Sequence, residues 1–114
     1  MSKMFAICIP VVKGKEDALK SFLGDINGKY KSSFQESRKK LGVRERTFHQ
    51  ATPMGEMVIV TLEGDNPADA FAKFAAGNDE FTKWFTAKVK EIHGIDLSAP
   101  PPGPMPEMMV DSGA

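Results

Sequence analysis

The sequence has few of the residues from which covalent and metal sites are built. It contains one cysteine, Cys8, and two histidines among 114 residues. A single cysteine cannot form a bridge within the chain, and no Cys/His spacing matches a zinc site. Cys8 has apolar neighbours, so we expect it to be a small buried hydrophobic side chain. The residues therefore predict neither a disulfide framework nor a metal site.

The chain also lacks an excess charge of either sign and any long hydrophobic run. It carries 15 basic and 15 acidic side chains, so its overall field is too weak to attract nucleic acid or an anionic membrane. The local basic run Arg38-Lys39-Lys40 is interpreted as a solvated helix end, where cations are favoured. The N-terminus does not have the pattern of a secretory signal, and no apolar stretch approaches transmembrane length. We expect a cytoplasmic protein without nucleic-acid or membrane partners.

Hydrophobic patterning predicts one domain over residues 1–98, followed by a Pro/Met-rich tail over residues 99–114 that has a short final strand. Strands are expected at about 3–12, 43–51, 56–63 and 107–111. A helix is expected from about 16 to 41, with a kink or break at Gly24 and Gly28 and an end at Gly42. A second helical region starts with Asn66 as its cap and Pro67 at the first helical position. It is interrupted near Gly77, resumes with Asn78 or Asp79 as a cap and ends at His93.

The order strand, helix, strand, strand, helix, strand is that of the α+β, ferredoxin-like βαββαβ fold. It predicts a four-stranded antiparallel sheet with the helices on one face. The first strand is apolar on both faces, because its alternating side chains from Met4 to Val12 are almost all apolar. Such a strand needs cover on both sides. We therefore expect a homodimer in which two sheets pack face to face.

These elements resemble the dimeric α+β barrel superfamily, which includes the antibiotic-biosynthesis monooxygenase-like, EthD-like and stress-responsive barrel proteins. The resemblance covers about residues 3–111 and rests on the element order, the two-sided first strand and the Phe81-x-x-Trp84 pair. Residues 50–55, 62–65 and 92–97 are similar to an uncharacterised bacterial subgroup. Members of the superfamily degrade haem, oxygenate aromatic compounds without a cofactor, isomerise lactones or have no known activity. The resemblance implies a fold more than a reaction.

Two polar residues of the second strand are the candidate catalytic residues. His49 is either a base or a ligand inside an apolar barrel, or a histidine bonded to a neighbour or to water. Arg46 either clamps a carboxylate or enolate oxygen or forms a cross-strand ion pair. The candidate ligand-binding residues are Tyr30, Phe48, Gln50, Phe81 and Trp84, of which Phe81 and Trp84 either form core or wall a pocket.

Haem is not expected as a cofactor. The haem-degrading members would imply an asparagine, a tryptophan and a histidine around the haem. Trp84 and His93 invite that comparison, but the first strand has no asparagine. His93 directly precedes Gly94, where a cation suits the helix dipole.

Two functions stay open. In the first, the barrel cavity binds or transforms a small apolar or aromatic molecule, in a cofactor-independent monooxygenase-like or isomerase-like reaction. It predicts a closed apolar cavity on which His49, Arg46, Gln50 or Tyr30 converge. In the alternative, the protein is a non-catalytic dimeric ligand-binding or structural module. That function predicts a barrel filled by Met, Ile and Phe, with His49 and Arg46 in solvent.

Overall fold

An antiparallel sheet forms one layer of the structure. The computed structural model describes residues 3–99 and 105–113, and within them the strands are β1 (Lys3–Pro10), β2 (Val43–Thr52) and β3 (Gly55–Gly64). Their order is β1-β3-β2, so β3 lies in the centre. The turn Thr52–Gly55 joins β2 to β3, as expected from its proline and glycine. The predicted hairpin is therefore confirmed. Next to the turn, each of its two strands is one residue longer than predicted.

Four helices lie in the described part of the chain: α1 (Glu16–Asn27), α2 (Lys31–Leu41), α3 (Pro67–Ala75) and α4 (Glu80–His93). The break expected near Gly28 separates α1 from α2. Asn66 caps α3 by accepting a hydrogen bond from the Asp69 amide, and Asp79 caps α4 by accepting one from the Thr82 amide. These caps confirm the helix starts predicted from local sequence.

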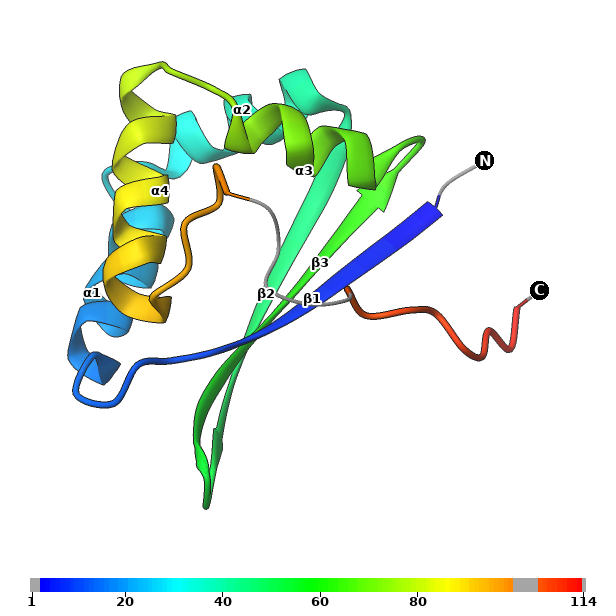
Figure 1. Ribbon diagram of the computed structural model, residues 1–114. Helices are drawn as coiled ribbons and strands as arrows, with labels where there is room; N and C mark the ends of the chain where they lie inside the picture. Colours follow the sequence, from blue (N-terminus) through cyan, green and yellow to red (C-terminus); the bar gives the residue numbers. More distant parts are fainter. Residues whose placement is uncertain (1–2, 100–104, 114) are drawn as a thin grey trace.

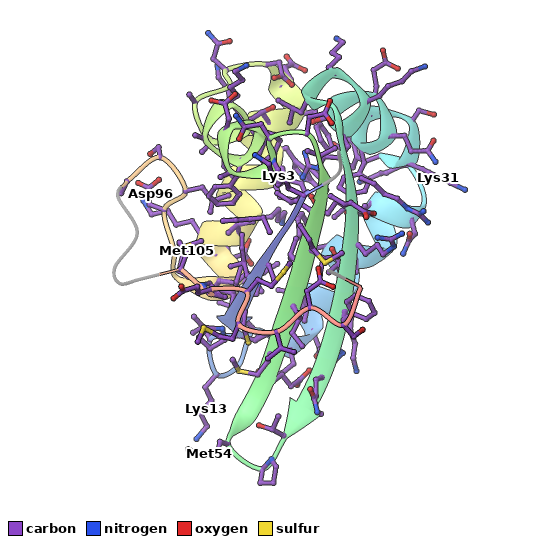
Figure 2. The ribbon with its side chains drawn as sticks, turned by 90° about the vertical axis from the view of Figure 1, so that its right-hand side faces the viewer. Lys3, Lys13, Lys31, Met54, Asp96 and Met105 are labelled. Carbon is purple, nitrogen blue, oxygen red and sulfur yellow. The ribbon has the colours of Figure 1, made fainter. Side chains whose placement is uncertain are left out.

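The helices cover one face of the sheet (Figure 1). Helices α1 and α4 lie side by side, and α2 and α3 cross the upper end of the strands. The core between the layers consists of Leu19, Phe22, Val58, Phe74, Phe85, Val89 and Ile92. The turn between β2 and β3 projects beyond the helices, and Met54 marks its tip (Figures 1 and 2). Side chains near this tip are therefore not covered by the helical layer.

The prediction of a four-stranded sheet is wrong for the described residues, which form three strands. Residues 105–113 have an extended course without strand pairing, so the strand expected at 107–111 is absent. They lie on the side of the sheet opposite the helices, where they cross in front of the strands in Figure 2. A strand requires a partner edge as well as a suitable composition, and this segment lies over the face of the sheet instead of at the β1 edge.

The sheet face away from the helices, which we name the open face, carries apolar side chains. Cys8, Ile59 and Phe48 lie opposite one another in one row across the three strands. Met4 is 46% exposed and Phe48 is 53% exposed. The prediction that Cys8 is buried is wrong for a single chain, because Cys8 is exposed on this face. The helices cover only the side chains that point the other way along each strand.

Candidate functional site

A cavity of about 80 Å³ lies between the sheet and the helices, and we name it the helix–sheet cavity. Its apolar walls come from all three strands and all four helices. The apolar lining residues are Ile7, Ile9, Leu19, Phe22, Leu23, Ile26, Leu41, Val43, Val58, Val60, Leu62, Ala70, Phe71, Phe74, Phe85, Val89 and Leu97. The polar lining residues are Arg38, Glu45, Thr47 and His93.

Arg38 and Glu45 form an ion pair in the wall of this cavity. Arg38 Nε donates to Glu45 Oε1 at 2.7 Å, and the two side chains are 8% and 7% exposed. Arg38 Nη1 also donates to the hydroxyl of Ser37 at 2.9 Å, and the Thr47 hydroxyl donates to Glu45 Oε2 at 3.3 Å. The interpretation of Arg38 as part of a solvated helix end is therefore wrong. Helix α2 turns its last residues toward β2, and this orientation buries the side chain.

Aromatic rings surround the Arg38 guanidinium. Its central carbon lies 4.7 Å from the ring centre of Phe34, 4.2 Å from that of Phe74 and 5.0 Å from that of Phe85. The ring faces attract a cation, and this attraction is strongest where water is excluded. The rings and Glu45 together explain why a charged group is tolerated in an apolar layer.

His93 lines the cavity from the end of α4. Its Nδ1–H donates to the carbonyl oxygen of Pro10 at 2.8 Å. Burial lowers the pKa of His93 below its ordinary value of 6.5, and the hydrogen bond to Pro10 only partly opposes this shift. The expectation of a cation at this helix end is therefore corrected: burial favours the neutral ring. In that state, Nε2 is the acceptor nitrogen.

The two candidate catalytic residues, His49 and Arg46, do not line the cavity. His49 projects from the same sheet face as Thr47, but it lies nearer the hairpin tip and pairs with Glu56. Arg46 is on the open face, where its Nη1 lies 3.4 Å from Glu63 Oε1. Both side chains are about one-third exposed. The structure thus places each of them beside a carboxylate and away from the other.

The candidate ligand-binding residues form two separate groups. Phe48 and Gln50 are exposed on the open face of β2. Tyr30, Phe81 and Trp84 come together where the start of α2 meets α4, and Tyr30 and Trp84 stack with ring centres 4.0 Å apart. Phe81 and Trp84 are partly buried and also pack against the hydrophobic core. These three side chains line a shallow surface hollow with Ser33, Glu80 and Lys83. The structure therefore brings together three of the five, outside the helix–sheet cavity.

Sequence reasoning missed Arg38 and Glu45, although a signal for both is present. Arg38 lies four residues after Phe34 and three before Leu41, so it falls on the apolar stripe of its helix. Glu45 follows Val43 by two residues and therefore shares its sheet face. Arg38 and Glu45 have opposite charges and both occupy positions that face the core, which indicates a buried ion pair.

In residues 3–99 and 105–113, no group of three His, Cys, Asp or Glu side chains is arranged to hold a metal ion. Within the same ranges, no helix has the length and apolar character needed to span a membrane. Comparisons with protein-family models, curated proteins and solved structures found no match. Any functional assignment must therefore rest on the fold and on the geometry of the cavity.

Proposed function

We propose that the protein is a homodimer of the dimeric α+β barrel type that binds a small apolar or aromatic molecule in the helix–sheet cavity. The observation that carries this proposal is the cavity itself, which has apolar walls and a single buried ion pair. Sites for small molecules are typically concave and apolar, with a few polar groups that orient the ligand. An apolar cavity of about 150 Å³ takes benzene. The helix–sheet cavity, at about 80 Å³, has roughly half this volume, so a single-ring molecule fits it when the surrounding side chains move apart.

The proposal concerns binding and assigns no reaction. The two side chains expected to be catalytic lie outside the cavity, and each is paired with a carboxylate. His49 and Arg46 therefore have no role in the proposed binding.

A second copy of the chain is the occupant that we propose for the open face. This face exposes apolar side chains together with Arg44, Arg46 and Glu63, so it offers both signs of charge to an identical face. Two-fold dimers bury the same patch on both subunits, which requires such self-complementarity. The Arg46–Glu63 pair lies beside the apolar row and meets this requirement.

The tail supplies contact area that the sheet alone lacks. Three strands of eight to ten residues present a face of about 450 Å². A standard interface buries about 800 Å² on each partner. Residues 105–113 lie on the same side of the sheet and expose Met108, Met109 and Val110. Their burial against the partner would make up the difference.

Cavity binding is tested by NMR titration of the full chain with toluene. Ala70 lines the cavity and is 3% exposed, whereas Ala72 is exposed on the same helix. Ala70→Leu fills the cavity and should weaken toluene binding at least tenfold. Ala72→Leu is the matched control and should bind like the unmodified protein. The proposal fails if toluene does not bind, or if it binds both variants equally.

The dimer is tested by size-exclusion chromatography with light scattering, which should give twice the 12.5 kDa chain mass. Phe48→Glu places a charge in the centre of the open face and should yield monomers. Met54→Glu, at the 98% exposed hairpin tip, should leave the dimer intact. Because Cys8 is the only cysteine, its reaction with a thiol reagent should be faster in the Phe48→Glu variant. A monomeric unmodified protein at micromolar concentration would reject the dimer.

A further inference from the structure

The polar groups of the helix–sheet cavity are concentrated where α2 meets β2. Arg38, Glu45 and Thr47 all line the cavity there. The other polar lining residue, His93, is hydrogen-bonded to Pro10 at the end of β1. Glu45 lies in the same row of the sheet as Phe5, which comes five residues before Pro10 in β1. Five residues of strand span about 17 Å. A single-ring ligand can therefore reach Arg38 and Glu45 or His93, but not both.

The Arg38–Glu45 pair retains capacity for further hydrogen bonds. A guanidinium has five N–H donors, and the described residues accept from two of them, through Glu45 and Ser37. The carboxylate of Glu45 accepts one bond on each oxygen, from Arg38 and from Thr47, and each oxygen has a second lone pair. The pair therefore offers both a donor and an acceptor to a ligand.

The aromatic rings restrict how a ligand approaches Arg38. Phe34, Phe74 and Phe85 lie within 5.0 Å of the guanidinium centre. The three rings occupy much of the space around the guanidinium, so a ligand atom reaches Arg38 through the N–H groups that they leave open. A flat ligand with one oxygen at its end satisfies this restriction.

The charge of the pair selects among such ligands. Arg38 and Glu45 sum to zero, so an anionic ligand would leave a net negative charge in an apolar cavity, which is costly. A pure hydrocarbon leaves the remaining donor and acceptor capacity unused. A neutral hydroxyl group uses both, because its oxygen accepts from Arg38 while its hydrogen is donated to Glu45.

We propose that the ligand of the helix–sheet cavity is a neutral single-ring aromatic molecule with one hydroxyl group, which binds between Arg38 and Glu45. This inference rests on the proposed binding function and specifies its ligand class. The apolar ring lies among the aliphatic and phenyl side chains of the cavity, and the hydroxyl group fixes its orientation. Arg38 and Glu45 are therefore specificity-determining residues.

The test compares toluene, phenol and benzoate, titrated at pH 7 into the unmodified full chain and followed by NMR. Toluene and phenol differ only by a methyl and a hydroxyl group. A cavity without a polar partner binds phenol roughly tenfold more weakly than toluene, since a buried unpaired hydroxyl is unfavourable. We expect the reverse, with phenol about tenfold tighter than toluene and at least tenfold tighter than benzoate.

A charge-changing variant separates specificity from a structural role. Glu45→Gln retains the shape of the side chain and an oxygen for Arg38, but it removes the negative charge. It should lower the affinity for phenol and raise the affinity for benzoate, so that benzoate becomes the tighter ligand. The matched control is Glu91→Gln on α4. The exposed Glu91 side chain forms ion pairs with Lys15 and Lys88, and this variant should leave all three affinities unchanged.

The three ligands are first compared in the unmodified protein, so the order of their affinities does not depend on whether a variant folds. Toluene tighter than phenol, with toluene binding lost in Ala70→Leu, overturns the ligand class and supports cavity binding. Benzoate tightest in the unmodified protein overturns the requirement for a neutral ligand. Failure of all three to bind overturns both the ligand class and the proposed function. An unchanged order of affinities in Glu45→Gln removes Glu45 from specificity.

Discussion

Loss of Arg38 is predicted to destabilise the fold far more than loss of an exposed cation. In Arg38→Met, the aliphatic part of the side chain and its contact with the phenyl rings are largely retained. What is lost is the charge that neutralises Glu45, whose side chain is 7% exposed. Removing one member of a buried ion pair costs about 3–5 kcal/mol, because the other member is left unpaired in an apolar environment.

An exposed ion pair on the same side of the molecule serves as the comparison. Lys73 Nζ lies 3.1 Å from Asp69 Oδ2 on α3, with side chains that are 69% and 50% exposed. Because water solvates both partners, Lys73→Met should cost less than about 0.5 kcal/mol. Each variant loses one positive charge. The difference between their free energies of unfolding therefore reflects the burial of the ion pair and not the removal of a charge.

The assay is urea unfolding at pH 7 and at a fixed protein concentration, since the proposed dimer would make the free energy of unfolding depend on concentration. The double variant Arg38→Met/Glu45→Leu removes both charges and should recover most of the stability lost in Arg38→Met. The reasoning is refuted if Arg38→Met is no more destabilising than Lys73→Met. It is also refuted if the double variant loses as much free energy of unfolding as Arg38→Met and Glu45→Leu lose in sum.

Two further predictions concern pH and glycine. Because the pKa of His93 is lowered on folding, the unfolded chain binds more protons below pH 6.5, and stability should fall as the pH drops through this region, by at most about 1.4 kcal/mol per pH unit. Urea unfolding from pH 7.5 to 5 should show this slope reduced in His93→Gln, and an unchanged slope in that variant would contradict the role of His93. A Cβ at Gly64 would overlap the carbonyl oxygen of Gly42, whereas one at Gly24 meets nothing within 4 Å. Thermal unfolding should therefore show Gly64→Ala destabilised by about 1–3 kcal/mol and Gly24→Ala stabilised by about 1 kcal/mol; equal effects would contradict the steric argument.

The helix–sheet cavity was not predicted from the sequence. The expected cavity was that of the barrel, with His49 and Arg46 among its polar residues, whereas the helix–sheet cavity lies between the sheet and the helices and neither residue lines it. Strand alternation places His49 on the face that meets the helices, as it does Thr47. The β2–β3 hairpin extends past the helical layer toward its tip (Figure 1), and the His49 side chain on this part of β2 is 33% exposed. Alternation along a strand predicts the direction of a side chain, but not whether another element reaches it.

The sequence by itself determined the local elements of this protein. The break at Gly28, the caps at Asn66 and Asp79 and the hairpin turn depend on residues only a few positions apart, so they could be predicted. Only the tertiary structure decided the burial of Arg38 against Glu45, the exposure of Cys8 and the course of residues 105–113. Burial depends on which elements cover which face, and this is set by contacts between segments distant in the chain.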